Sequence, residues 1–257
     1  MQRIDAFMRR LNPVGAASIA FALLLAFACL GALGGCAAEK PHPQSTSNRS
    51  AEVTVFSQTF AAPAYEGALS IAVHDDAPDF ADILNTTSVF IEFSPLDSFG
   101  RCGPAVGLIC RETMPEGPRA EIQSVKPTGF YNAEYPWIDR QWVYNRCHLI
   151  AFALGGGDAN ELNLITGTHA LNIEAMLPLE ERVISYVYRS GNHVLYRVTP
   201  IFEGHELVAR GVLMEARSVE DDGAGLSFCR FCFNVEPGVV IDYATGYTHA
   251  DGTISTE

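Results

Sequence analysis

The pattern of hydrophobic and polar positions divides the 257-residue chain into three parts. Residues 1–35 contain an uncharged, mainly apolar run from 13 to 35. Residues 36–51 are polar and contain Pro and Ser, a composition typical of a flexible linker. Residues 52–257 alternate short hydrophobic segments with turns that contain Gly and Pro. The sequence therefore predicts one folded domain over 52–257, preceded by a leader and a tether.

The leader has the features of a bacterial lipoprotein signal peptide. Arg3, Arg9 and Arg10 precede the apolar run, which ends in small residues directly before Cys36. In lipoprotein processing such a cysteine is acylated and becomes the new N-terminus, so Cys36 is the predicted lipidation site. An uncleaved transmembrane anchor is the alternative, because about 20 apolar residues span a bilayer. Both interpretations place the domain outside the cytoplasm, held at a bacterial membrane or secreted.

Short strands are expected in the first half of the domain, where β-branched and aromatic residues gather between turn residues. Residues 75–79 form a loop, and residues 94–129 are rich in Gly and Pro, which indicates mostly irregular structure. The strand predicted over residues 141–144 leads directly into the motif at residues 145–148. The predicted strands cover residues 52–60, 89–93, 122–125 and 141–144.

The clearest helix of the domain is predicted over residues 178–191, after a loop at 155–160. Pro178 suits a first helical turn and Gly191 suits a stop. The apolar residues recur at helical spacing, namely Leu179, Val183, Tyr186 and Val187.

Two strand pairs are expected after this helix. Residues 193–202 and 207–216 alternate in polarity and predict a hairpin. Residues 226–235 and 239–243 predict a second pair, with its turn at Pro237-Gly238.

Composition and charge limit the kind of nucleic-acid contact that this chain can make. Hydrophobic residues make up 48% and charged residues 18% of the sequence, as in folded globular proteins. The formal net charge is −13, and it falls to near −15 without the leader. Affinity for nucleic acid normally comes from Lys and Arg side chains that neutralise phosphates. The sequence therefore excludes a broad basic clamp, and any positive charge has to be local, from a metal ion and a few arginines.

Five of the seven cysteines lie in the predicted domain. Cys102 and Cys110 flank a loop that contains Gly and Pro, and they are a candidate disulfide outside the cytoplasm. Cys229 and Cys232 form a C-x-x-C pattern, which elsewhere signals redox or metal chemistry. Neither a second cysteine pair nor a strand-to-helix junction accompanies the pattern, so buried strand cysteines are the favoured interpretation.

Residues suited to phosphodiester hydrolysis are concentrated between the strand that ends at residue 144 and the predicted helix. Such a reaction needs a base, a cation and groups that orient both. Histidine is the natural base near neutral pH. Asparagine offers a neutral oxygen to Mg²⁺, and a first-turn glutamate can hold one of the waters of the metal. The candidate residues are Arg146, His148, Asn163, Asn172 and Glu180.

Each of these residues also has a simpler structural interpretation. A histidine after a strand is commonly structural, loop asparagines cap turns, and a first-turn glutamate complements the helix dipole. Their combination favours a site, because Asn163 lies nine positions before Asn172 and Glu180 lies eight positions after it.

Residues 144–150, 163–168 and 171–174 resemble the secreted DNA/RNA non-specific endonuclease family, the ββα-metal or His-Me finger nucleases. In that family a D-R-G-H-like motif supplies the base, and the metal asparagine, the earlier asparagine and the later glutamate have the same two intervals. The resemblance covers about residues 80–245. Asn145 and Cys147 replace the usual aspartate and small residue, which leaves open what orients the imidazole.

The resemblance implies an α+β, ββα-metal (His-Me finger) nuclease fold, a central antiparallel sheet with the metal-site helix packed on it. It implies an endonuclease for DNA, with RNA as a further substrate, that uses Mg²⁺, or Mn²⁺ as the alternative, and leaves 5′-phosphate ends. His148 then deprotonates water, Asn172 holds the metal and Glu180 holds a metal water. Asn163 and Arg146 complete the catalytic set, the first by fixing the metal loop and the second through phosphate or an acidic partner.

Arg119 and Lys126 are further candidates for contacts to the nucleic-acid backbone, with solvated surface charge as the alternative. Contacts to phosphates read no base edges, so little sequence preference is expected. The expected partners are nucleic acid and the membrane that holds the lipid, with no obligate protein partner.

Two other functions compete with the nuclease. The first is a non-catalytic surface lipoprotein that binds DNA for uptake, although the intact set of His148, Asn163, Asn172 and Glu180 argues against a pure binder. The second is a redox lipoprotein that acts through the C-x-x-C pattern.

Overall fold

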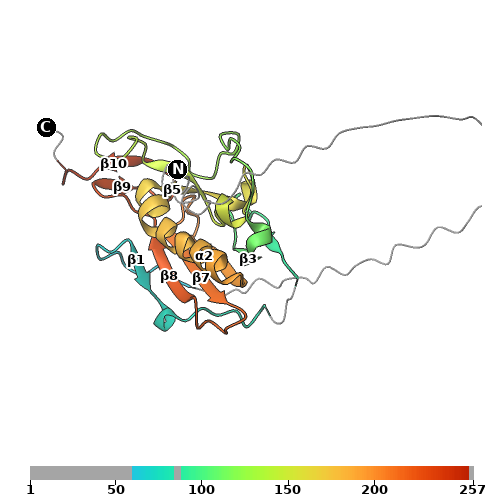
Figure 1. Ribbon diagram of the computed structural model, residues 1–257. Coiled ribbons are helices and arrows are strands. Elements are labelled where there is room, and N and C mark those ends of the chain that lie inside the picture. Colours follow the sequence, from blue (N-terminus) through green and yellow to red (C-terminus); the bar gives the residue numbers. More distant parts are fainter. Residues whose placement is uncertain (1–59, 84–87, 255–257) are drawn as a thin grey trace, which may run out of the picture. The chain divides into compact units, whose positions relative to one another are not determined.

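The computed structural model describes residues 60–83 and 88–254 (Figure 1). The predicted leader, the tether, the lipidation site Cys36 and nearly all of the strand at 52–60 lie outside the described residues. Within the described part of the chain, no helix is long and apolar enough to cross a membrane.

A six-stranded antiparallel sheet forms the centre of the domain, in the order β1-β8-β7-β6-β3-β2. The longest pairing joins β6 to β7, from Val194 opposite Ser218 to Ile201 opposite Gly211. This pairing confirms the predicted hairpin, although its second strand begins later than expected. The strands of the sheet are β1 (Ser70–Ala72), β2 (Ile91–Phe93), β3 (Ala105–Ile109), β6 (Val194–Ile201), β7 (Gly211–Ser218) and β8 (Ser227–Phe233).

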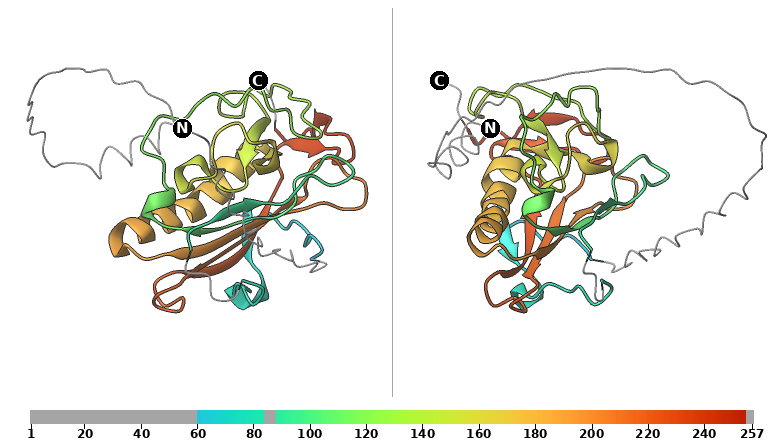
Figure 2. Two further views of the ribbon diagram at one scale, coloured as in Figure 1. Left: turned by 90° about the vertical axis from the view of Figure 1, so that its right-hand side faces the viewer. Right: turned by 45° about the vertical axis from the view of Figure 1, so that its right-hand side comes forward.

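A hairpin and a helix lie together on one face of this sheet (Figures 1 and 2). The hairpin pairs β4 (Tyr144–His148) with β5 (Leu164–Thr168). A π-helical turn, η5 (Ala170–Met176), then leads directly into α2 (Leu177–Ser190). The observed order of two strands and a helix, with the helix on an antiparallel sheet, confirms the expected ββα architecture.

Helix α2 confirms the predicted helix almost residue for residue. Its buried side chains include Leu179, Val183 and Val187, which recur at helical spacing and face the sheet. The helix ends where Gly191 adopts a left-handed conformation with φ 74°, and the Gly191 N–H donates to the Val187 carbonyl.

The opposite face of the sheet is covered in part by the chain on either side of β1 (Figure 2). Phe60 and Ile71 pack there against the buried Phe231 of β8. Arg197 of β6 pairs with Glu215 of β7, at 2.8 Å, and with Asp82. Both faces of the sheet are therefore occupied, and only the hairpin and helix side carries the candidate catalytic residues.

Two predicted strands are wrong, and the backbone explains why. The strand expected over 141–144 begins only at Tyr144, because Arg140 and Gln141 adopt positive φ values of 64° and 67°, which a strand does not allow. The motif at 145–148 therefore lies within a strand instead of after it. Residues 122–125 form a turn, in which the Val125 N–H donates to the Ile122 carbonyl.

The last predicted strand pair also differs from the structure. Strand β8 pairs with β7 and β1, so both of its edges are occupied. The segment after the turn therefore finds another partner, and β9 (Val239–Ile241) pairs with β10 (Thr248–Ala250).

All five cysteines of the described residues are free thiols. The candidate disulfide between Cys102 and Cys110 is therefore wrong. The Cys102 thiol instead donates to backbone carbonyls at Glu161 and Leu164, 3.2 and 3.3 Å away. Cys229 and Cys232 are fully buried on β8, as predicted. Because they are three residues apart on a strand, their side chains point to opposite faces.

Candidate active site

The end of strand β4 places His148 against the loop that follows it. The His148 ring is 6% exposed. Its Nε2 lies 3.1 Å from both the Gly157 and the Asp158 carbonyl oxygens, and its Nδ1 lies 3.0 Å from Arg119 Nη2. A guanidinium can only donate, so Nδ1 is the acceptor and Nε2 carries the hydrogen. The surroundings therefore select the tautomer in which the Nδ1 lone pair faces Arg119.

The same surroundings keep the imidazole neutral. Burial, followed by the positive charge of Arg119, lowers the pKa of His148 to about 4. The carbonyls of Gly157 and Asp158 oppose this shift without reversing it. At neutral pH His148 is therefore an unprotonated base.

A run of three glycines shapes the loop that orients the imidazole. A side chain at Gly156 would bring its Cβ within 1.8 Å of the Ile150 carbonyl oxygen. Only glycine allows this approach, which brings the Gly157 and Asp158 carbonyls to the ring. These carbonyls, and not Asn145, orient His148. The Asn145 amide nitrogen is buried and has no hydrogen-bond partner among the described residues.

Asn163 fastens this loop to the start of β5. Its side chain is fully buried at the end of the short helix η4 (Glu161–Asn163). Its Oδ1 accepts from the Ile150 N–H, and its Nδ2 donates to the Ile150 and Gly156 carbonyls, each at 2.9 Å. Asn163 therefore positions the loop after β4, through hydrogen bonds to backbone alone. Its role in fixing the metal loop, which carries Asn172, stays a prediction.

Asn172 lies in the π-helical turn η5, just before α2. Its side chain is half-buried, and its Oδ1 accepts a hydrogen bond from the Cys147 thiol at 3.2 Å. A carbonyl oxygen has two lone pairs, so one stays available to a metal ion. Burial and nearby Glu180 raise the pKa of the Cys147 thiol well above its usual value, which keeps it a donor.

Glu180 lies in the first turn of α2, and its side chain is 7% exposed. Burial, with a contribution from Glu181, raises the pKa of Glu180 to about 8, while Arg119 acts in the opposite direction. The buried Tyr196 hydroxyl beneath it has no hydrogen-bond partner among the described residues. The helix dipole and the Arg119 charge together do not offset the burial of this carboxyl group, so the site can accommodate further positive charge.

The residues present fit a hydrated divalent metal ion. No group of three or more His, Cys, Asp or Glu side chains in the described part of the chain is arranged to hold a bare metal. Mg²⁺, however, keeps several waters and takes few protein ligands, chiefly oxygens. The available Asn172 oxygen and the undercompensated Glu180 carboxyl suit that requirement.

Arg119 interacts with both His148 and Glu180. It comes from the irregular segment before β4, and the neighbouring Ala120 N–H donates to the Asp158 side chain at 2.8 Å. Besides its contact with His148, its charge interacts with Asp158, Cys147 and Glu180. The sequence singled out Arg119 as a cation but contains no signal that it reaches His148.

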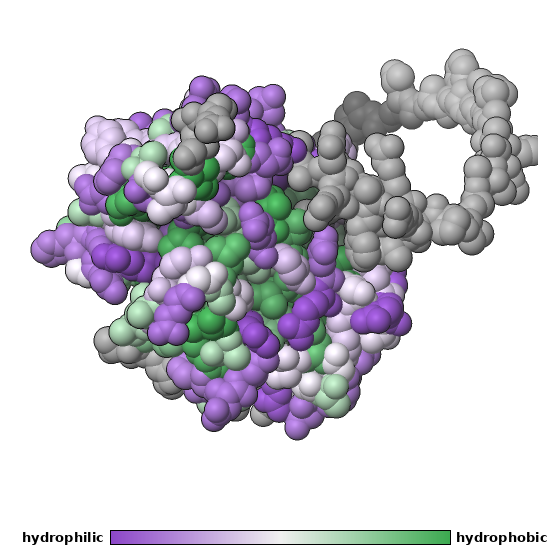
Figure 3. Space-filling view, turned by 90° about the vertical axis from the view of Figure 1, so that its left-hand side faces the viewer, coloured by the Kyte–Doolittle hydropathy of each residue, from purple (hydrophilic) through white to green (hydrophobic). Residues whose placement is uncertain are grey.

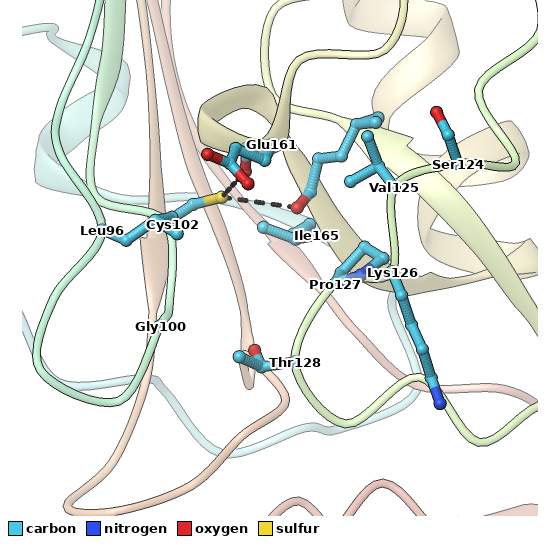
Figure 4. Close-up of a pocket in the computed structure, with 11 residues that line it drawn as sticks. Leu96, Gly100, Cys102, Ser124, Val125, Lys126, Pro127, Thr128, Glu161 and Ile165 are labelled. Carbon is cyan, nitrogen blue, oxygen red and sulfur yellow. Dashed lines mark hydrogen bonds between the residues drawn. The ribbon is translucent and has the colours of Figure 1, made fainter.

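The other two predicted cations lie elsewhere. The Arg146 guanidinium donates to the Val125 and Gln123 carbonyls, at 2.5 and 3.1 Å, and stacks on Phe130. It therefore anchors the preceding loop, and it forms no ion pair with an acid among the described residues. Its predicted place in the catalytic set stays a prediction. Lys126 lies at the rim of a pocket of about 160 Å³, with its amine directed away from Cys102 (Figure 4).

Two strands and a helix on an antiparallel sheet are the fold of the ββα-metal nucleases. Residues 90–220 match the sequence model of the family described as DNA/RNA non-specific endonuclease, and the chain belongs to that family.

Individual relatives agree with this assignment. A curated deoxyribonuclease of Streptococcus dysgalactiae subsp. equisimilis is 34% identical over 113 residues. The match covers 42% of this chain and 33% of the relative, so the chain spans about a third of that protein.

Two solved structures share the fold. Sda1 nuclease with a bound zinc ion has a TM-score of 0.62 at 24% identity, over 71% of this chain and 96% of its own. NucA from Streptococcus agalactiae with a magnesium ion has a TM-score of 0.58 at 22% identity, over 70% and 86%.

Proposed function

We propose that this domain is a metal-dependent endonuclease that hydrolyses the phosphodiester bonds of DNA, with RNA as a further substrate. The observation that carries the proposal is the His148 environment. A buried, neutral imidazole, held through Nε2 by two carbonyls, presents an Nδ1 lone pair to a group that bears positive charge. That arrangement suits a general base for water.

Each candidate residue has its own role in the proposed reaction. His148 Nδ1 takes a proton from the attacking water, and Nε2–H stays on the Gly157 and Asp158 carbonyls. Arg119, which contacts Nδ1, exchanges that contact for a phosphate oxygen. Losing the nearby charge raises the pKa of His148 and makes it a stronger base as substrate binds. Asn163 keeps the loop in place throughout.

Asn172 and Glu180 would hold the metal, Asn172 through Oδ1 and Glu180 through a bound water. A divalent ion such as Mg²⁺, when bound, supplies positive charge to the phosphate and the leaving oxygen, with 5′-phosphate ends as the product. The magnesium and zinc named for the two structural relatives support a divalent ion. The acidic chain has little other positive charge to offer, since its net charge is −13.

We place the enzyme outside the cytoplasm, held by a lipid on Cys36 or released by secretion. The charged start, the apolar run and the small residues before Cys36 support this location.

Plasmid cleavage separates an enzyme from a surface receptor of the same fold. The purified domain is incubated with supercoiled plasmid and Mg²⁺, with and without a chelator. Nicked and linear products that form only with Mg²⁺ are expected. Retention of the plasmid without metal-dependent cutting would replace the nuclease with the DNA-binding alternative.

A further inference from the structure

Two exposed tyrosines from distant parts of the chain stack on each other beside a lysine. The rings of Tyr131 and Tyr247 have centroids 4.6 Å apart and an interplanar angle of 23°. The two residues are 45% and 61% exposed. The Lys126 amine lies 5.3 Å from the Tyr131 ring centre. We call these three residues the aromatic platform.

The platform is built on tightly packed backbone. Gly246 precedes Tyr247 and has φ 89°, and a Cβ there would lie 1.9 Å from the Gly129 carbonyl oxygen. Gly129 itself has φ 65°, and its carbonyl accepts from the Tyr131 N–H at 3.0 Å. The two loops therefore touch backbone to backbone, a contact that only glycines allow. This packing holds the tyrosines in place before any ligand arrives.

The platform contains a lysine, a residue type that is rare in this chain. The sequence contains two lysines against 30 acidic residues. Within the described residues, Lys126 forms no ion pair with a carboxylate, whereas arginines such as Arg197 and Arg210 do. Its charge is therefore available to an anion.

Figure 3 looks onto the side of the molecule where β9 and β10 lie in Figure 1. On this side, hydrophilic residues predominate around a central group of hydrophobic ones.

The platform connects to the active site through one chain of contacts. Phe130, next to Tyr131, lies under the Arg146 guanidinium, 4.6 Å from its ring centre. Arg146 precedes His148 by two positions on β4, so both project from the same side of that strand. A strand of nucleic acid bound at His148 can therefore continue along this side toward the tyrosines.

We propose that the aromatic platform binds an unpaired, single-stranded segment of nucleic acid, with a base stacked on the tyrosines and the adjacent phosphate on Lys126. The proposal rests on the proposed function, which supplies the nucleic-acid substrate. An aromatic face beside a cation accepts any base, whereas a duplex keeps its bases stacked on one another and out of reach. Single strands and frayed ends are therefore favoured over blunt duplex.

The test measures oligonucleotide binding by fluorescence anisotropy. The full chain carrying His148→Ala, which prevents cutting, is titrated against labelled single-stranded oligothymidylate and against a blunt duplex, both with Mg²⁺. Adding Tyr131→Ala and Tyr247→Ala is expected to weaken single-strand binding about tenfold and duplex binding much less. Tyr131→Phe with Tyr247→Phe should restore binding, because stacking needs the ring and not the hydroxyl.

A matched control and a salt series complete the experiment. Tyr65→Ala removes another exposed tyrosine, which packs on Phe233 elsewhere, and should leave binding unchanged. Lys126→Gln should lower the dependence of single-strand binding on salt by about 0.7 in log–log slope, the amount for one phosphate. The thermal unfolding midpoint checks that each variant is folded.

The outcomes separate this proposal from the nuclease. Equal affinity of the alanine variant and its parent for oligothymidylate, or an equal loss with single strand and duplex, would overturn the platform even if the wild-type chain cuts plasmid. Selective loss of single-strand binding would support the platform even if no cutting were found.

Discussion

The Cys147 thiol donates to the Asn172 Oδ1 across 3.2 Å, and so joins the strand that carries His148 to the turn that carries the proposed metal ligand. Cys147 is fully buried and its pKa is raised well above the usual range, so the hydrogen stays on sulfur. A thiol that donates at this position favours the amide oxygen over the amide nitrogen on that side. The motif cysteine, Cys147, thus has a physical role in orienting Asn172.

Removing this donor is expected to weaken metal binding. Cys147→Ala leaves the Asn172 amide free to rotate, and loss of a group that orients a ligand typically costs ten- to a hundredfold in metal affinity. We predict Mg²⁺ binding about tenfold weaker for Cys147→Ala by isothermal titration calorimetry, with a smaller loss for Cys147→Ser, which keeps a donor. Cys232→Ala removes another fully buried thiol and should leave the affinity unchanged. An unaltered affinity in Cys147→Ala would disprove the orienting role.

The charge of Arg119 contributes, after burial, to the lowered pKa of His148. Burial and the Arg119 charge lower the pKa of His148 to about 4 in the wild-type chain. Arg119→Ala removes the second of these causes, so the pKa should rise while staying below its ordinary value of 6.5, because burial remains. NMR titration of the His148 ring measures this directly. A higher pKa keeps the imidazole protonated to higher pH, so the acid limb of kcat/KM should move upward as well.

Two variants control this measurement. Arg119→Lys keeps the charge and should leave the pKa of His148 closer to the wild-type value than alanine does. Arg189→Ala removes an exposed arginine of α2 and should have no effect. The same His148 pKa in Arg119→Ala and in the wild type would show that the charge of Arg119 does not affect the protonation of His148.

Replacing Asn163 is expected to lower the free energy of unfolding, in addition to any effect on catalysis. Asn163→Ala removes three buried hydrogen bonds and leaves the Ile150 N–H and two carbonyls without partners. At roughly 1 kcal/mol or more for each, the free energy of unfolding should fall by about 3 kcal/mol in urea denaturation. Asn160→Ala removes one hydrogen bond, from the Leu162 N–H, and should cost about 1 kcal/mol. Similar losses in the two variants would contradict the clamping role of Asn163.

Local signals in the sequence predicted much of the fold. The spacing of Leu179, Val183 and Val187, with Gly191 after them, predicted α2 because both signals act within a few turns of one helix. The alternating segments of β6 and β7 predicted their hairpin for the same reason. The pairing of β8 with β1 was missed, since strand partners depend on contacts between distant segments that alternation does not specify.

The sequence predicted which residues form the candidate site better than it predicted the contacts between them. The intervals between Asn163, Asn172 and Glu180, with the family resemblance, identified the candidates. The Arg119 contact with His148 was missed because Arg119 comes from irregular chain, where no periodicity fixes a side chain. The glycines at 155–157 predict a loop, but nothing in the sequence indicates that the absence of a Cβ at Gly156 lets the carbonyls reach the imidazole.

Single-turnover cleavage of an end-labelled duplex, measured across a Mg²⁺ titration, tests the division of labour between His148 and Asn172 most directly. His148→Ala should lower the maximal rate at least a hundredfold without changing the Mg²⁺ concentration at half-maximal rate, because it removes the base alone. Asn172→Ala should instead move that midpoint to higher Mg²⁺. Cleavage by His148→Ala at the wild-type rate, or cleavage by the wild-type chain in excess chelator, would contradict the account.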